Sequence, residues 1–150
     1  MSKSILMHGN QNDSIEITVY YKLINKRNFT KYVPIDEEEY EKLSEDLEVK
    51  DNIGMLKTWW RPQTWHTNNR ILNESKTYSV QTETSEFDII KYQQNLLKYC
   101  LVSWDMVDDN NQPIEINEQN IGSLPNDVAV HMIEQYNSIA MDNDEETKKK

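Results

Sequence analysis

The sequence predicts a mainly helical (α+β) fold, a compact helical domain with a small N-terminal β-hairpin. Apolar residues alternate with polar ones over residues 15–24, the period of two typical of a half-buried strand. Over residues 36–49, 86–106 and 124–140 apolar residues recur every three or four positions, as in helices that bury one face. We therefore expect a flexible N-terminal lead at residues 1–13, a single globular domain at residues 14–140 and a disordered charged tail at residues 141–150.

The elements follow one another with recognisable ends. Residues 29–33 are expected to return as the second strand of the hairpin. Asp36 then has the features of a helix N-cap, with Glu39 completing a capping-box pattern, and the helix should end near Val49. Residues 56–61 should be extended, because Pro62 disfavours helix for the residue before it.

The second half is expected to be helical. A helix should begin after Pro62 and run to about Asn73, followed by a polar loop over residues 74–84. Ser85 and Asp88 form a second capping pattern, which predicts a long central helix over residues 86–106. Asn117 should cap a brief helix, and the last helix should begin near residue 124.

Composition restricts the possible functions. The net charge is −10, the pI is about 4.7 and the mean hydropathy is −0.85. Such a charge repels nucleic acid and anionic lipid, so we expect no direct nucleic-acid binding and no membrane partner. The single cysteine, Cys100, lies in an apolar run and is expected to be a buried thiol. With no stretch that resembles a membrane span, these features favour a reducing cytoplasm.

No pattern of catalytic or cofactor-binding residues is present. The three histidines lack the spacing of metal ligands, and the three glycines are too few for phosphate-binding loops. The acidic turn over residues 105–111 lacks the glycine that a calcium loop requires. We therefore expect no enzyme activity, no metal and no cofactor, and a protein that acts by binding other proteins.

The segment over residues 59–65 is rich in tryptophan and has two interpretations. Its tryptophans either anchor the core or form an exposed patch, since Trp, Tyr and Arg dominate interface hot spots. Both interpretations can hold together. The predicted protein-binding residues are Trp59, Trp60, Arg61, Trp65 and Trp104.

The acidic run over residues 36–51 also has two interpretations. A solvated helix face is the usual meaning of a charge run, and a docking face for a basic partner is the functional one. The same charges leave open a mimic of DNA. The predicted acidic face consists of Glu37, Glu38, Glu41, Glu45 and Glu48.

The order of motifs resembles the tail assembly chaperones of tailed bacteriophages. The segment W-W-R-P-Q-T-W is followed by a polar loop and by the run KYQQNLLKYCLVSWD. After these come D-D-N-N-Q-P-I, a short N-I-x-x-L-P segment and a last helix. The resemblance covers residues 55–140, and the N-terminal β element and the acidic helix lie outside it.

The resemblance implies a small assembly factor of the host cytoplasm. Such chaperones bind the tape measure protein while the tail tube forms around it, and tube subunits then displace them. Two alternatives stay open: a small structural component of the tail or neck, and an acidic inhibitor of host defence that imitates DNA.

Overall fold

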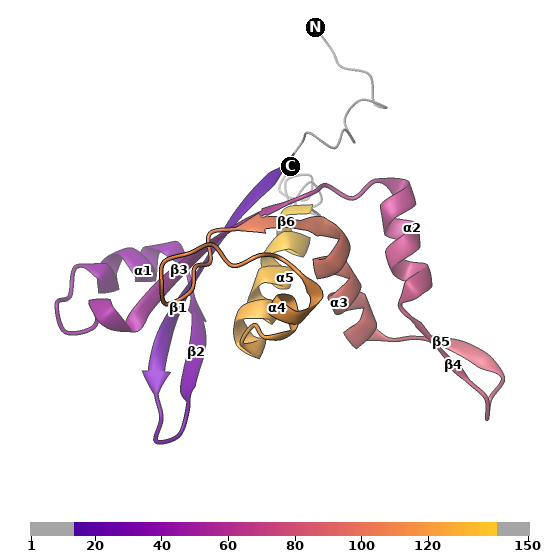
Figure 1. The fold of residues 1–150 in the computed structure, drawn as a ribbon, viewed down its shortest axis with the longest axis horizontal. Helices are drawn as coiled ribbons and strands as arrows, with labels where there is room; N and C mark the ends of the chain where they lie inside the picture. The colour runs from indigo at the N-terminus through magenta and orange to yellow at the C-terminus, as the bar shows by residue number, and fades with distance from the viewer. Residues whose placement is uncertain (1–13, 141–150) are drawn as a thin grey trace, which may run out of the picture. The chain divides into compact units, whose positions relative to one another are not determined.

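The computed structural model describes residues 14–140, and the predicted lead and tail lie outside the described residues. Of the described residues, 42% are helical and 31% lie in strands. The prediction of a mainly helical fold is therefore wrong, and the class is α+β. The strands β1 (Ile15–Asn25), β2 (Thr30–Ile35), β3 (Ile53–Trp60) and β6 (Leu101–Trp104) form one antiparallel sheet of order β2-β1-β3-β6 (Figure 1).

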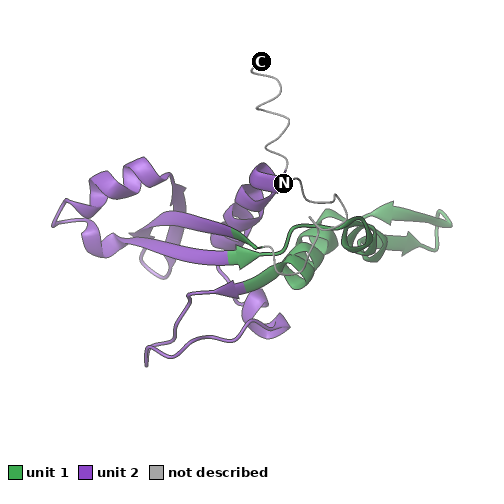
Figure 2. Cartoon of the chain, turned by 90° about the horizontal axis from the view of Figure 1, so that it is seen from above, with its two compact units in different colours: residues 1–15, 59–102 green, residues 16–58, 103–150 purple. Residues whose placement is uncertain are grey.

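The backbone contacts divide the chain into two compact units (Figure 2). Of the described residues, unit 1 contains 14–15 and 59–102, and unit 2 contains 16–58 and 103–140. The chain therefore enters unit 1 within β3 and leaves it within β6. The expectation of a single globular domain stays a prediction.

The hairpin of unit 2 confirms the predicted N-terminal β element. Strands β1 and β2 pair antiparallel from Tyr20 opposite Ile35 to Asn25 opposite Thr30. The turn closes where the Lys26 N–H donates to the Phe29 carbonyl at 2.8 Å. The sheet continues to β6, where the Asp105 N–H donates to the Lys57 carbonyl at 3.1 Å.

Helix α1 (Glu37–Ser44) starts as predicted and ends earlier than predicted. The Asp36 carboxylate accepts the Glu39 N–H at 2.7 Å, which confirms the N-cap. Beyond Ser44 the acidic run would place carboxylates at the negative end of the helix dipole. There the Asp46 carboxylate instead accepts the Glu48 N–H at 2.9 Å, so the chain turns and passes through the short 3₁₀ helix η2 (Lys50–Asn52).

The last helices of unit 2 follow the predicted pattern. Asn117 caps the brief helix α4 (Glu118–Gly122) by accepting the Asn120 N–H at 2.8 Å. Helix α5 (Asn126–Ala140) packs against β2. It does so with an apolar stripe that is buried, as the spacing of its residues predicts: Val128, Met132, Ile133 and Tyr136.

Unit 1 departs from the sequence-based prediction in two places. It contains α2 (Trp65–Glu74), β4 (Lys76–Ser79), β5 (Thr84–Phe87) and α3 (Ile89–Cys100). The predicted loop over residues 74–84 is wrong, because most of it forms the antiparallel hairpin β4–β5. The predicted helix over residues 86–106 is too long at both ends, since β5 precedes it and β6 follows it.

The core of unit 1 lies between its two helices. Helices α2 and α3 pack against each other through Ile71, Leu96, Leu97 and Cys100, each at most 4% exposed. Cys100 is thus a buried thiol, as expected. The hairpin between the helices contributes little to this core, because its strand residues are exposed apart from the half-buried Ser79.

Candidate functional site

The tryptophan segment contributes to both the core and the surface. Trp60, at the end of β3, is fully buried, whereas Trp59 beside it is half-buried and Arg61 is exposed. Trp65 begins α2 and is 82% exposed. The Thr64 hydroxyl caps this helix by accepting the Thr67 N–H at 3.2 Å. Of this segment, Trp65 is therefore the tryptophan that can contact a partner without rearrangement.

Trp104 is a core residue of unit 2. It is 8% exposed, and its indole N–H donates to the Ile114 carbonyl at 2.7 Å. That bond satisfies the polar group of the buried ring and ties β6 to the segment that follows it. The predicted protein-binding residues are therefore distributed over two units, and Trp60 and Trp104 are too buried to serve as surface anchors.

A second apolar surface lies in unit 1, where the sequence predicted a loop. Cross-strand pairing places Tyr78 beside Ser85, and Phe87 beside Lys76, so both aromatic rings lie on one face of the hairpin. Within unit 1, each large apolar side chain on this face, in the turn and at the helix start keeps more than half of its surface exposed. We call these five side chains, which are 54–80% exposed, the hairpin surface: Tyr78, Val80, Phe87, Ile89 and Ile90.

The base of the hairpin is fixed by Asp88, the N-cap of α3. Its carboxylate accepts the N–H groups of Ile90 at 3.0 Å and Lys91 at 3.2 Å, and the Thr77 hydroxyl at 3.0 Å. The Lys91 N–H and the Thr77 hydroxyl stabilise the ionised form, so the pKa of Asp88 is lowered below its ordinary value. The Phe87 ring also contacts the Tyr92 ring, at 5.6 Å between centroids. The hairpin is therefore anchored to α3 at its base.

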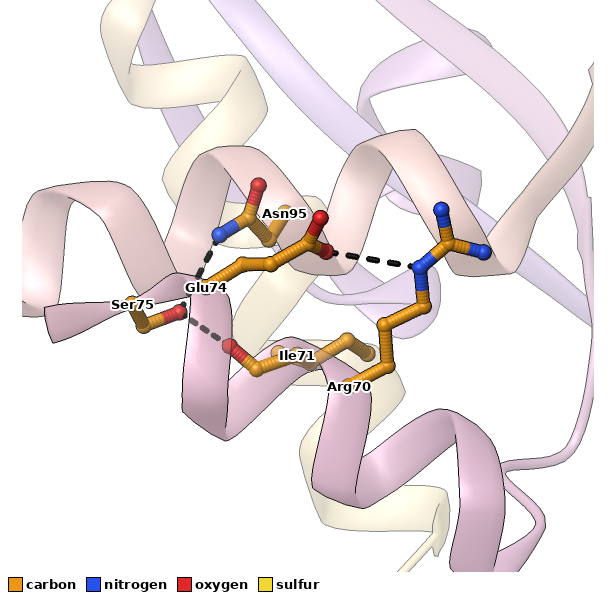
Figure 3. A network of polar contacts seen from close by, with 5 residues as sticks. All are labelled: Arg70, Ile71, Glu74, Ser75 and Asn95. Atoms are coloured by element: carbon orange, nitrogen blue, oxygen red, sulfur yellow. Dashed lines mark hydrogen bonds and ion pairs between the residues drawn. The ribbon is translucent and has the colours of Figure 1, made fainter.

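Ser75 joins α2, the hairpin and α3 (Figure 3). Its side chain is fully buried, and its hydroxyl donates to the Ile71 carbonyl at 2.5 Å and accepts from the Asn95 amide at 3.2 Å. Its carbonyl accepts the Asp88 N–H at 2.7 Å. One side chain and its backbone thus fix where the hairpin leaves the helices, which determines where the hairpin surface points within unit 1.

The predicted acidic face lies in unit 2 and is not one helix face. Three of its five carboxylates belong to α1, whereas Glu45 is the C-cap and Glu48 lies beyond the helix. All five are exposed. The ion pair of Glu38 with Lys42, at 3.5 Å, joins two side chains that are more than three-quarters exposed and contributes little to stability.

Charge is unequally divided between the units. Residues 59–102 carry four acidic side chains and five basic ones, whereas residues 16–58 and 103–140 carry seventeen acidic and seven basic ones. The hairpin surface therefore belongs to a nearly neutral unit, and the negative charge of the described residues is concentrated in the other unit.

Two further properties concern residues 14–140 as a whole. Within this range no three side chains of the types that ligate metals gather in one place. No helix in the same range is both long enough and apolar enough to cross a bilayer.

The hairpin surface was missed because its sequence contains no glycine or Asn-Gly turn. Glu83 occupies the turn with φ of 52°, a left-handed conformation that usually favours Gly or Asn. The available indication was the run of Thr, Tyr, Ser and Val over residues 77–80, which has high β propensity.

Comparisons of the chain with protein-family models, curated proteins and solved structures found no match.

Proposed function

We propose that this chain binds other proteins during assembly, as a tail assembly chaperone of a tailed bacteriophage acting in the host cytoplasm. Its client would be the tape measure protein, which it keeps soluble and hands over to tail tube subunits. The phage context comes from the resemblance of the motif order over residues 55–140. The observation that supports protein binding is the hairpin surface.

The hairpin surface has the properties of a docking site for an apolar segment. Val80 is 80% exposed and Ile90 is 63% exposed, on an anchored hairpin and at a capped helix start. Covering apolar area is worth roughly 25 cal/mol per Å², and clustered exposed apolar side chains mark interaction sites more often than isolated ones do. A client segment with an apolar face would gain this energy without requiring the chaperone to unfold.

Modest affinity suits the proposed role. Five partly exposed side chains form a small contact compared with the roughly 800 Å² per partner of a standard stable interface. Small interfaces release their partners quickly, so tube subunits could displace the chaperone. The acidic unit 2 would meanwhile keep the complex soluble through charge repulsion between copies.

The test is co-expression with the tape measure protein encoded near this gene. The soluble fraction of the tape measure protein should rise with the wild-type chain. It should fall back with the double variant Val80→Ser/Ile90→Ser, which removes two of the most exposed apolar side chains of the hairpin surface. The matched control is Phe29→Ser/Leu47→Ser, which changes side chains 63% and 77% exposed in unit 2 and should retain the activity.

Two results would contradict the proposal. If the tape measure protein is no more soluble with the chain than without it, there is no chaperone activity towards this client. If the chain is found at stoichiometric amounts by mass spectrometry of purified virions, it is a structural component rather than a chaperone.

A further inference from the structure

Strand β1 has an open edge in unit 2. The Lys26 N–H donates to the Phe29 carbonyl, so Lys26 and Phe29 form a hydrogen-bonded pair. Hydrogen-bonded pairs occur at every second residue of an antiparallel ladder, so the even-numbered residues of β1 point their N–H and C=O groups toward β2. Strand β2 ends at Ile35, opposite Tyr20, whereas β1 extends back to Ile15. The N–H and C=O groups of Thr18 therefore point beyond the end of β2.

A hollow of about 490 Å³ lies at this edge. Its walls come from β1, from the end of β2 and start of α1, and from α5. This volume is in the range of ligand-binding pockets, about 300–1,000 Å³. We call it the β1 groove, and its chemically distinctive lining residues are Thr18, Tyr20, Asp36, Glu37, Glu39 and His131.

The β1 groove is negatively charged. Burial lowers the pKa of His131 below its ordinary value, so this imidazole is mostly neutral at pH 7 and offsets little of the charge. Lys22 pairs with Glu39 at 3.7 Å, but both side chains are 40% or more exposed, and an ion pair in water is weak. The carboxylates of Asp36 and Glu37 bear no such ion pair among the described residues.

An aromatic side chain completes the groove. Burial and then the negative charge of Glu37 raise the pKa of the Tyr20 hydroxyl above its ordinary value, and the Tyr20 ring contacts the Tyr40 ring at 4.9 Å between centroids. A tyrosine held beside carboxylates can contact the aliphatic stem of a lysine or arginine while a carboxylate accepts from its charged head.

We propose that the β1 groove binds an extended, lysine- or arginine-bearing segment of another protein, which adds as a strand to the open edge of β1. An extended backbone presents alternating C=O and N–H groups that can pair with the N–H and C=O groups of Thr18, as in other strand-addition complexes. The surrounding carboxylates select basic side chains. A second copy of the chain fits poorly, because its own unit 2 is strongly acidic. This inference does not rest on the proposed function, since it concerns different residues.

The experiment titrates the full chain at pH 7 with a short capped peptide that alternates lysine with valine. NMR follows the backbone amide of Thr18, and hydrogen exchange reports its protection. The lysine peptide should shift and protect this amide, more weakly at high salt. The matching peptide with glutamate for lysine should leave it unchanged.

Two variants test separately the carboxylates of the β1 groove and the backbone edge of β1. Glu37→Gln/Glu39→Gln should weaken peptide binding about threefold to tenfold, as expected for two partly exposed ion pairs. The control Glu38→Gln/Glu45→Gln makes the same change of charge outside the groove and should have little effect. Thr18→Pro removes the outward N–H, which an edge position tolerates, and should abolish binding of the lysine peptide, measured by calorimetry because this variant has no amide at residue 18, while the fold persists by circular dichroism.

Three results would overturn the proposal. Equal weakening by the control pair would mean that binding follows net charge alone, and an unperturbed Thr18 amide would mean that no strand is added. If the Thr18 amide is protected without peptide, either in a concentration-dependent way or until residues 141–150 are deleted, the occupant is a second copy or the chain's own lysine-ended tail.

Discussion

Replacing Ser75 by alanine tests how the hairpin is held to the helices of unit 1. The hydroxyl of Ser75 donates to the Ile71 carbonyl and accepts from the Asn95 amide, in a site with no solvent access. Ser75→Ala removes both bonds and leaves the backbone bond from Asp88 in place. The substitution therefore isolates the side chain's part of the network.

The expected loss of unfolding free energy is about 2 kcal/mol. A hydrogen bond contributes a net of about 0.5–1.5 kcal/mol, and two bonds are lost. The Asn95 amide, which is half-buried, is left without this acceptor, and an unsatisfied buried group costs about 1–3 kcal/mol. Urea unfolding followed by tryptophan fluorescence measures the change, and the m-value should stay constant because the folded core is unchanged.

Ser44→Ala is the matched control. The Ser44 hydroxyl donates to the Glu41 carbonyl at 2.7 Å at the exposed end of α1, where water replaces the lost bond. Its effect should stay within about 0.5 kcal/mol. In a double-mutant cycle, Ser75→Ala and Asn95→Ala should destabilise by less than the sum of the two single changes, since they remove the same bond. A Ser75→Ala effect no larger than that of Ser44→Ala would refute the reasoning.

Other substitutions probe single features of the two units. Tyr99→Phe should leave stability unchanged or raise it by about 1 kcal/mol in thermal unfolding, because the buried Tyr99 hydroxyl has no hydrogen-bond partner among the described residues. Gly54→Ala should cost about 1–3 kcal/mol in urea unfolding, because a Cβ at Gly54 would overlap the Tyr21 ring. His131 should titrate by NMR with a pKa below its ordinary 6.5. Because its pKa in the folded protein is lowered, its contribution to stability is present above pH 6.5 and is lost as the pH falls through that folded pKa. The neutral replacement His131→Gln should flatten this part of the profile of stability against pH. Asp88→Ala should speed hydrogen exchange of the first-turn amides of α3, and unchanged exchange would count against its role as the cap.

Local patterns in the sequence predicted the elements that depend on local chemistry. The alternation over residues 15–24 predicted β1, and the short polar caps Asp36 and Asn117 were identified with the helices that follow them. Pro62 correctly separated an extended segment from a helix. In each of these cases the residues themselves satisfy the backbone groups of the element they begin or end.

Elements that depend on distant pairing were not predictable in the same way. Leu97, Leu101 and Trp104 recur at helical spacing, so the pattern predicted a continued helix where β6 forms. Strand β6 exists because β3 pairs with it, and the Asp105 carboxylate accepts the Lys57 N–H at 3.0 Å at its end. No local preference of Leu101 to Trp104 encodes that partner, and tertiary context decides strand formation more than propensity does.

Of the predicted protein-binding residues, the structure leaves some exposed and buries others. An exposed aromatic surface was expected, and Trp65 is exposed, but the larger apolar surface lies on the hairpin. Burial of Trp60 could not be inferred from composition, since a tryptophan is equally suited to a core and to an interface. The β1 groove required knowledge of where β2 ends relative to β1, which is a property of the pairing register.

The exposure of the hairpin surface is itself an argument for binding. An isolated two-stranded hairpin is marginally stable in water, and this one holds its rings on a face that no described residue of unit 1 covers. Buried bonds at Ser75 and a charged cap at Asp88 nevertheless hold its base in one position. An anchored hairpin with an exposed apolar face is the feature on which the proposed protein binding depends.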